Sequence, residues 1–324
     1  MFMIVAPIFL VIFIGYCFGR LRPDSGLSDK LINDYVLYIA LPALLFLAIA
    51  RADISELQQW GFIAATLVGI CVVYVLGMLA AKIMGIGLPQ SSILSMGACY
   101  GTTGYMGVPI LIAVYGESAA LPAAIATILH NIPAIMAVII TYDIFSTRQS
   151  GGRISISQSF VGALKTILSN PLTISVIAGL IFVCFGIPVP IFLQTFAEFL
   201  GNAAGPTALF ALGLGLSRLK VKEHINGEAL KLVIPMLLLK LGIQPLITFI
   251  CAYYLFGMQQ ANNIWLITAI VMAAQPIGAG VYVFANKYGF KQEIISFSII
   301  ISLLIALVTI PTILQLLPEW HSGA

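Results

Sequence analysis

The sequence predicts an all-α integral membrane protein with ten transmembrane helices, arranged as two inverted repeats of five helices. Three observations support this fold class. The 324 residues are 60% hydrophobic and only 8% charged, with a mean hydropathy of +1.07, whereas soluble domains contain about 25% charged residues. Apolar runs of about 20 residues, long enough to cross a bilayer, recur along the whole chain. Basic residues gather in every second connection between these runs.

The apolar runs are each bounded by polar or turn-forming residues, which gives ten predicted spans. The first five cover residues 2–19, 30–50, 60–84, 91–115 and 119–145, and the second five cover residues 165–185, 191–216, 230–256, 263–288 and 293–317. We therefore expect a first repeat at 1–145, a cytoplasmic connecting loop at 146–162 and a second repeat at 163–324. No connection is long enough to fold as a separate soluble domain, so the two repeats should form a single unit.

The two halves share weak sequence features. Leu-Pro-Ala-Leu-Leu-Phe at 41–46 in span two is similar to Gly-Pro-Thr-Ala-Leu-Phe at 205–210 in span seven. Because each repeat holds an odd number of spans, the second copy must lie inverted in the membrane, which is typical of secondary transporters.

The basic residues predict the orientation. All but two of the fifteen Lys and Arg residues lie in the connections after the odd-numbered spans; Arg51 lies in the opposite set and Lys240 lies inside a span. Because cytoplasmic connections carry an excess of Lys and Arg, we expect both termini outside the cytoplasm, with the protein in the inner (cytoplasmic) membrane. The thirteen are Arg20, Arg22, Lys30, Lys82, Arg148, Arg153, Lys165, Arg218, Lys220, Lys222, Lys231, Lys287 and Lys291.

Two stretches inside spans four and nine concentrate residues that interrupt helices. They are Cys-Tyr-Gly-Thr-Thr-Gly-Tyr-Met-Gly-Val-Pro at 99–109 and Met-Ala-Ala-Gln-Pro-Ile-Gly-Ala-Gly at 272–280. Glycine weakens a helix, and proline removes a donor and clashes with the preceding turn. In hydrocarbon a broken helix survives only against protein or a water-filled cavity. Broken spans at matching places in two halves therefore indicate a transporter binding site near the bilayer midplane.

We expect span four to restart near residues 107–109 and span nine near residues 278–280. The two helix N-termini would then converge, and their free N–H groups and positive dipole ends suit an anionic group. In the alternative interpretation, the glycines only allow helices to pack closely. The predicted substrate-binding residues are Thr102, Thr103, Gly104, Gly107, Pro109, Asn131, Gln275, Pro276 and Gly278.

Three ionisable residues within spans are candidates for ion coupling or for a structural charge. A lysine at the membrane centre costs about 2.5–3.5 kcal/mol, so Lys240 should face the protein interior or a cavity, with Gln244 on the same helix face. Lys240 could form a structural ion pair, with Glu198 as partner, or titrate during transport. His130 could relay protons, although a lone helical histidine is more often a packed residue.

Five short motifs connect the chain to a known family. They are Tyr-Ile-Ala-Leu-Pro-Ala-Leu-Leu-Phe at 38–46, Gly-Tyr-Met-Gly-Val-Pro-Ile at 104–110, Gly-Pro-Thr-Ala-Leu-Phe-Ala-Leu-Gly at 205–213, Leu-Lys-Leu-Gly-Ile-Gln-Pro at 239–245 and Gln-Pro-Ile-Gly-Ala-Gly-Val-Tyr-Val-Phe-Ala at 275–285. Each motif is weak, but their order over essentially the whole chain is specific. The chain resembles the auxin efflux carrier family, which includes bacterial permeases for malonate and other organic acids and the plant PIN auxin exporters.

The resemblance implies that spans four and nine cross at their breaks. It also implies a scaffold domain and a moving transport domain, and hence elevator-type alternating access. Many relatives carry an asparagine before the Gly-x-x-Gly-x-Pro break, where this chain has Thr102. A hydroxyl can still bond a carboxylate, but because of this departure the resemblance is not a safe basis for assigning auxin specificity to this chain.

We therefore interpret the chain as a secondary transporter of small organic anions such as malonate, with auxin-like acids as a further substrate class. No phosphate-binding loop is present, so a proton or sodium gradient is the expected driving force, with no metal and no other cofactor. Expected partners are the anion, the lipid bilayer and a second copy in a homodimer. A net charge of +3 without a basic tract argues against nucleic acid.

Alternative functions are less consistent with the motifs of this sequence. A cation/proton antiporter or a sodium/bile-acid-type symporter shares the crossed-helix design, but residues 102–109 and 275–280 contain none of the carboxylates that antiporters place there. An intramembrane enzyme is disfavoured because no Gly-x-Gly-Asp, His-Glu-x-x-His or Gly-x-Ser-x-Gly motif is present. A channel would be separated from a carrier by stoichiometric ion coupling.

Overall fold

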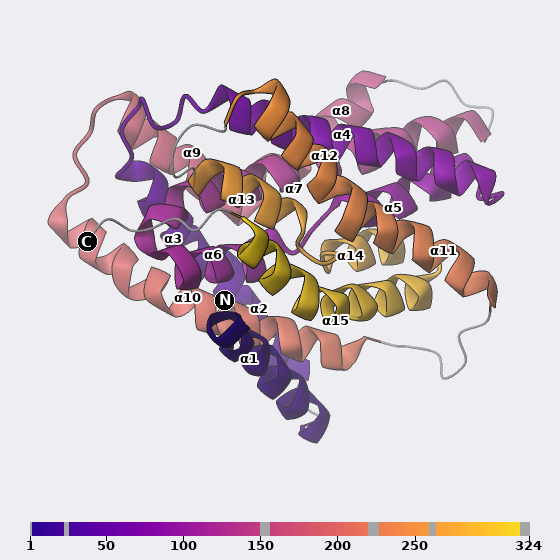
Figure 1. Ribbon diagram of the computed structural model, residues 1–324, viewed down its shortest axis with the longest axis horizontal. Helices are drawn as coiled ribbons and strands as arrows, with labels where there is room; N and C mark the ends of the chain where they lie inside the picture. The colour runs from indigo at the N-terminus through magenta and orange to yellow at the C-terminus, as the bar shows by residue number, and fades with distance from the viewer. Residues whose placement is uncertain (1, 23–25, 150–155, 220–226, 259–263, 318–324) are drawn as a thin grey trace.

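The computed structural model describes residues 2–22, 26–149, 156–219, 227–258 and 264–317, and the regular elements among them are all helical (Figure 1). The basic residues Arg153, Lys220 and Lys222, which support the predicted orientation, lie outside the described residues. The elements are α1 (Phe2–Leu21), α2 (Gly26–Tyr35), η1 (Val36–Ala40), α3 (Leu41–Ala50), α4 (Trp60–Ile83), α5 (Leu88–Cys99), η2 (Thr103–Gly107), α6 (Val108–Tyr115), η3 (Gly116–Ala119), α7 (Ala120–Gln149), α8 (Ile156–Leu168), α9 (Pro171–Cys184), α10 (Ile191–Arg218), α11 (Gly227–Leu238), η4 (Leu239–Ile243), α12 (Gln244–Ile250), η5 (Cys251–Leu255), α13 (Ile264–Ala273), α14 (Gly280–Lys287) and α15 (Gln292–Leu316).

The described helices form a multi-pass membrane protein. Seven of them are long and apolar enough to cross a membrane, or eight if the bent pair α8–α9 counts as one span. The predicted spans four and nine are not continuous helices. Each is divided into two short helices, α5 and α6 in the first half and α13 and α14 in the second. These divisions and the bend between α8 and α9 contribute to the smaller number of long helices compared with the ten predicted spans.

The connection predicted at 146–162 contains helical residues at both ends, and residues 150–155 lie outside the described part of the chain. Helix α7 continues through residue 149 and α8 begins at residue 156. The buried residues Ala163 and Ile167 of α8 are one turn apart, so this segment has a buried helix face despite its polar residues. A bend of 75° separates α8 from α9. It occurs because Pro171 begins a new helix, which Asn170 caps by accepting the amide of Leu172 at 2.9 Å.

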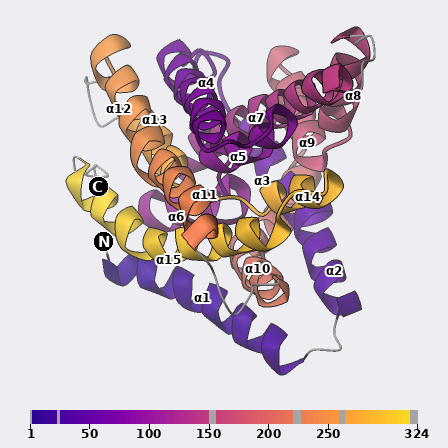
Figure 2. The ribbon, with the colours of Figure 1, turned by 90° about the vertical axis from the view of Figure 1, so that its right-hand side faces the viewer.

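The helices pack around two hydrophobic cores. The smaller core joins η1, α3, α9 and α10, with Ala124 of α7 at its edge. The larger core joins α4–α7 with α11–α15 and takes in one face each of α1, α8 and α10. In Figure 2, α1, α2 and α10 lie on one side of the molecule and α4, α12 and α13 on the opposite side.

Small residues set the distance between α1 and α10. A Cβ atom at Gly15 would overlap the carbonyl oxygen of Phe210, and one at Gly213 would overlap the carbonyl oxygen of Ile12. The two helix backbones can therefore touch only because these positions are glycine, a common basis of close helix packing in membranes.

Candidate functional site at the helix crossing

The first helix break lies between α5 and η2. The chain leaves α5 at Cys99, runs through residues 100–102, and becomes helical again at Thr103. The restart is therefore about one turn earlier than the sequence predicted. The carbonyl of Thr102 accepts the amides of Met106 at 3.1 Å and Gly107 at 3.3 Å, which starts helical hydrogen bonding before Pro109 is reached. Gly104 and Gly107 consequently lie within the second half-helix rather than ahead of it.

The second break separates α13 from α14, with the restart at Gly280 within the predicted 278–280 range. The two breaks lie antiparallel and bond to each other. The amide of Thr102 donates to the carbonyl of Pro276, and the amide of Gly278 donates to the carbonyl of Tyr100, both at 3.0 Å. Each broken helix thus supplies hydrogen-bond partners to the other, which meets the demand for satisfied backbone groups inside a membrane.

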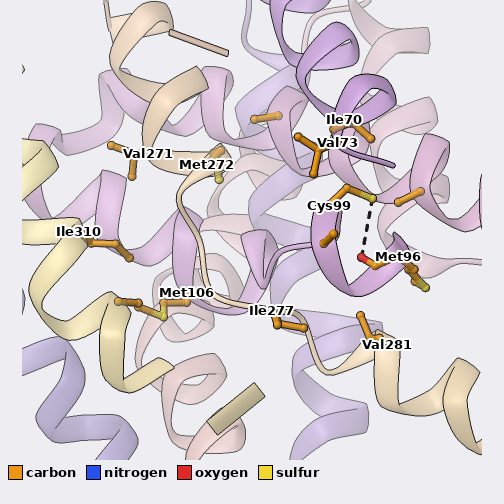
Figure 3. Close-up of a cluster of buried hydrophobic side chains, with 14 of the residues drawn as sticks. Ile70, Val73, Met96, Cys99, Met106, Val271, Met272, Ile277, Val281 and Ile310 are labelled. Atoms are coloured by element: carbon orange, nitrogen blue, oxygen red, sulfur yellow. Dashed lines mark hydrogen bonds between the residues drawn. The ribbon is translucent and has the colours of Figure 1, made fainter. Parts of the chain in front are cut away.

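Close contact at this crossing requires glycine. A Cβ atom at Gly278 would lie 2.6 Å from Cε1 of Tyr100 and 3.0 Å from the backbone carbon of Gly101. A Cβ atom at Gly107 would lie 2.5 Å from Sδ of Met272 and 3.3 Å from Cγ of Gln275. Figure 3 shows the apolar packing around the breaks, with Met272 and Ile277 from the second broken segment and Met106 from the first. The glycines therefore do serve close packing, as the alternative interpretation held.

Lys240 holds the C-terminal ends of both first half-helices. Its side chain is 0% exposed, and Nζ donates to Oε1 of Gln244 at 2.6 Å and to the carbonyl of Ala273, the last residue of α13, at 2.7 Å. Gln244 in turn donates from Nε2 to the carbonyl of Cys99, the last residue of α5, at 3.0 Å. A helix C-terminus carries a partial negative charge, so the two helix ends stabilise a buried cation in place of a carboxylate.

The predicted ion pair between Lys240 and Glu198 is wrong. Glu198 is bound by Arg51 at the end of α3. Lys240 is fully buried against the crossing, whereas about two-fifths of the Glu198 side chain is exposed. The sequence predicted both Lys240 and Glu198 within spans, but Lys240 is buried and Glu198 is partly exposed, so they do not share one environment.

Two polar side-chain atoms at the breaks lack a hydrogen-bond partner among the described residues, one at the start of η2 and one just beyond the end of α13. Oγ1 of Thr103 and Oε1 of Gln275 are buried and have no hydrogen-bond partner among the described residues. Nε2 of Gln275 donates to the carbonyl of Val271 at 3.0 Å. No side chain caps the helix at Thr102, which is 8% exposed. A buried polar group without a partner costs about 1–3 kcal/mol, so these atoms indicate a place for a ligand or water.

Helix α7 brings a third such atom to the same region. His130 is 1% exposed, and its Nδ1 lies 2.9 Å from the carbonyl of Ala126, so Nδ1 carries the proton and Nε2 is an acceptor. Nε2 is buried and has no partner among the described residues. Thr127, one turn earlier, lies 3.5 Å from the Cβ position of Gly104 in η2. Asn131 follows His130 and is 8% exposed.

A cavity beside the crossing is formed mainly by residues that the sequence analysis did not propose. It has a volume of about 330 Å³ and lies between α1, α6 and α10. Pro109 borders it, and so do Glu117 and Asn202. A second cavity of about 430 Å³ adjoins it and is lined by Arg51. The sequence signal for this region is Arg51, the one basic residue in the predicted connections after the even-numbered spans.

The chain is similar in sequence to proteins named as transporters. Residues 1–314 match the model of the family described as "Membrane transport protein". A protein named "Putative malonate transporter" from Rhizobium meliloti (strain 1021) is 30% identical, over 99% of this chain and 96% of the relative. The uncharacterized transporter YfdV of Escherichia coli (strain K12) is 26% identical over 73% of this chain and 76% of its own. Auxin efflux carrier component 8 of Arabidopsis thaliana is 28% identical over 45% of this chain and 39% of its own.

Proposed function

Because this chain belongs to the membrane transport protein family, which includes auxin efflux carriers, and is a membrane transporter rather than an enzyme, we propose that it carries small organic anions by secondary active transport. Malonate and other short dicarboxylates are the first candidates, and auxin-like acids are a further class. The similarity to a protein named as a malonate transporter supports the choice of substrate.

The observation that carries the proposal is the pair of helix N-termini at the crossing, beside buried polar atoms without protein partners. Free amides at the start of η2 and the hydroxyl of Thr103 can donate to a carboxylate. Oε1 of Gln275 and Nε2 of His130 are acceptors, which suit a proton-bearing group, a water or a cation. Donors and acceptors in one region fit an anion that binds together with a coupling proton or sodium ion. Thr102, Asn131, Pro276 and Gly278 would complete the substrate site.

Lys240 has a supporting role in this proposal. It is linked to the carbonyl ends of the first half-helices, and its Nζ lies 3.2 Å from the Cβ position of Gly101, as does Cβ of Gln275. We assign it the task of holding the crossing together and of adding positive potential near the anion.

The proposed transport cycle uses the ten predicted spans in two inverted repeats, in the inner membrane with both termini outside the cytoplasm. Helices around the smaller core would form a scaffold, and helices around the crossing would move against it as an elevator. The two hydrophobic cores and the cavities between α3, α6, α7 and α10 support this division. A homodimer through the scaffold remains part of the proposal.

Uptake of labelled malonate into liposomes containing the purified protein tests the function. Uptake that depends on an imposed pH or sodium gradient and is competed by other short dicarboxylates is the expected result, and the effective gradient identifies the coupling ion. Protein-free liposomes and liposomes with no gradient serve as controls. If no mono- or dicarboxylate, including aromatic ones, enters under either gradient, organic-anion transport is wrong for this chain.

A further inference from the structure

The two cavities beside the crossing adjoin each other and together extend from Arg51 to Pro109. They share the lining residues Leu44, Glu117, Gly201 and Asn202. The larger cavity reaches Arg51 and Glu198, and the smaller one reaches Pro109 at the start of α6. We call the two adjoining cavities together, from Arg51 to Pro109, the Arg51 vestibule. Its walls come from α1, α3 and α10 on one side and from α6, η3 and α7 on the other, so it lies between the proposed scaffold and the proposed moving body.

The mouth of the vestibule holds an ion pair that is open to the cavity. Nη2 of Arg51 donates to Oε1 of Glu198, and the two side chains are 39% and 41% exposed. Nε2 of Gln194 donates to the same oxygen at 3.5 Å. A guanidinium has five N–H donors and can serve a second carboxylate in addition to the one it already binds. Asn202 lies one turn beyond Glu198 and lines both cavities.

The position of Arg51 along the sequence is unusual. In the connections on its side of the membrane it is the one basic residue, while thirteen others lie on the opposite side. Basic residues on the side that carries few of them do not help to set the orientation of a membrane protein. A lone arginine at the mouth of a path to the crossing therefore calls for another explanation.

We propose that Arg51 is a receiving site for the carboxylate of the transported anion, at which the substrate takes the place of Glu198. The planar guanidinium fits a carboxylate through two parallel hydrogen bonds. Asn202 would receive the anion next, on the way to Pro109 and the crossing. The cavity volume of about 430 Å³ falls in the usual range for small-molecule sites, about 300–1,000 Å³. This inference rests on the proposed function, organic-anion transport.

The two acidic residues of the vestibule set its selectivity. Arg51, Glu117 and Glu198 are the charged residues that line it. Glu198 comes from α10, whereas Glu117 comes from η3 on the other wall. Both carboxylates oppose the entry of an anion by like-charge repulsion. Replacing either one by a neutral residue should therefore make the anion bind more tightly.

The competing explanation is that the ion pair only ties the end of α3 to α10. The two explanations predict opposite effects of Glu198→Gln on substrate binding. If the ion pair is purely structural, removing either partner weakens the same link between α3 and α10. The two variants should then show the same effect. If Arg51 receives the substrate and Glu198 competes for it, Arg51→Gln weakens substrate binding and Glu198→Gln strengthens it.

The test measures initial rates of labelled malonate uptake into cells over a range of concentrations, with the amount of each variant in the membrane determined by immunoblot. Arg51→Gln should raise KM about 10-fold with little change in the maximal rate, because a charge-assisted hydrogen bond is lost. Arg51→Lys should give an intermediate KM. Glu198→Gln and Glu117→Gln should each lower KM about 3-fold by the same reasoning. Matched controls are Arg148→Gln and Glu56→Gln, two exposed residues outside the vestibule, which should behave like the unmodified chain.

Other outcomes overturn the inference in recognisable ways. An unchanged KM in Arg51→Gln, with normal uptake by the unmodified chain, removes the receiving site and leaves the proposed function intact. Equal increases in KM, or equal losses of folded protein, in Arg51→Gln and Glu198→Gln show that the ion pair is purely structural. If the unmodified chain takes up no short carboxylate at all, the proposed function is wrong, and the proposed receiving site is wrong as well.

Discussion

Nζ of Lys240 lies 2.7 Å from the carbonyl oxygen of Ala273, where the first half of a broken helix ends. Through Gln244 the same side chain is linked to the carbonyl of Cys99, where the other broken helix ends. A fully buried lysine is expensive inside a membrane unless its charge is compensated. Here the compensation comes from two helix C-termini, so Lys240 and the crossing stabilise each other.

Replacing Lys240 by methionine should therefore damage the crossing itself. Lys240→Met leaves Oε1 of Gln244 and the carbonyl of Ala273 without their donor, at a cost of about 1–3 kcal/mol for each group. We expect a lower melting temperature of the purified protein, and a reduced rate or altered pH dependence of uptake. Lys231→Met is the matched control, because Lys231 is exposed. Unchanged melting and an unchanged pH profile of uptake would show that Lys240 does not support the crossing.

The contact between the two breaks should tolerate no side chain at Gly278. Gly278→Ala places a Cβ atom against Tyr100 and the backbone of Gly101, and overpacking of this kind costs about 1–3 kcal/mol. We expect at least about a 10-fold lower uptake rate per folded molecule, and a larger loss in Gly278→Leu and Gly107→Leu. Gly215→Ala in α10 is the control, since nothing lies within 4 Å of its Cβ position. Normal uptake in Gly278→Leu or Gly107→Leu would remove the crossing as the substrate site.

The hydroxyl of Thr103 should matter for transport but not for stability. Thr103→Val keeps the shape of the side chain and removes an oxygen that has no partner among the described residues. We expect unfolding to be unaffected and KM for the anion to rise about 10-fold, from the loss of one hydrogen bond to a charged group.

The control for this prediction is Thr127→Val. Oγ1 of Thr127 donates at 2.8 Å to the carbonyl of Ala123 in its own helix, so it is already engaged. Its loss should change KM little. Equal KM values for the two variants would argue that Thr103 does not contact the substrate.

The distribution of basic residues predicts which loops face the cytoplasm. Glu56 precedes α4 and Lys82 lies at its other end. In intact cells, a membrane-impermeant thiol reagent should label Glu56→Cys but not Lys82→Cys, in a background without the five native cysteines. A tag at the C-terminus should likewise be accessible from outside. Labelling of Lys82→Cys alone, or a tag reached only from the cytoplasm, would reverse the proposed orientation.

Much of the membrane architecture could be predicted from the sequence. Long apolar runs identify a multi-pass helical protein, and the glycines and prolines at 99–109 and 272–280 locate both helix breaks. The ordered short motifs identify the family. These properties are local, because hydropathy and helix-breaking residues act within a few turns of the chain. Even here, the restart at Thr103 differs by about one turn from the prediction, since hydrogen bonding to Thr102 outweighs the proline signal.

Relationships between distant residues were decided only by the tertiary structure. The sequence showed that Lys240 must be compensated, but only the packed helices bring Ala273 to it and leave Glu198 to Arg51. In the same way, only packing of α3, α6 and α10 creates the vestibule at Arg51. The physical reason is that burial can be read from composition, whereas the partner of a buried charge depends on which helix surfaces meet.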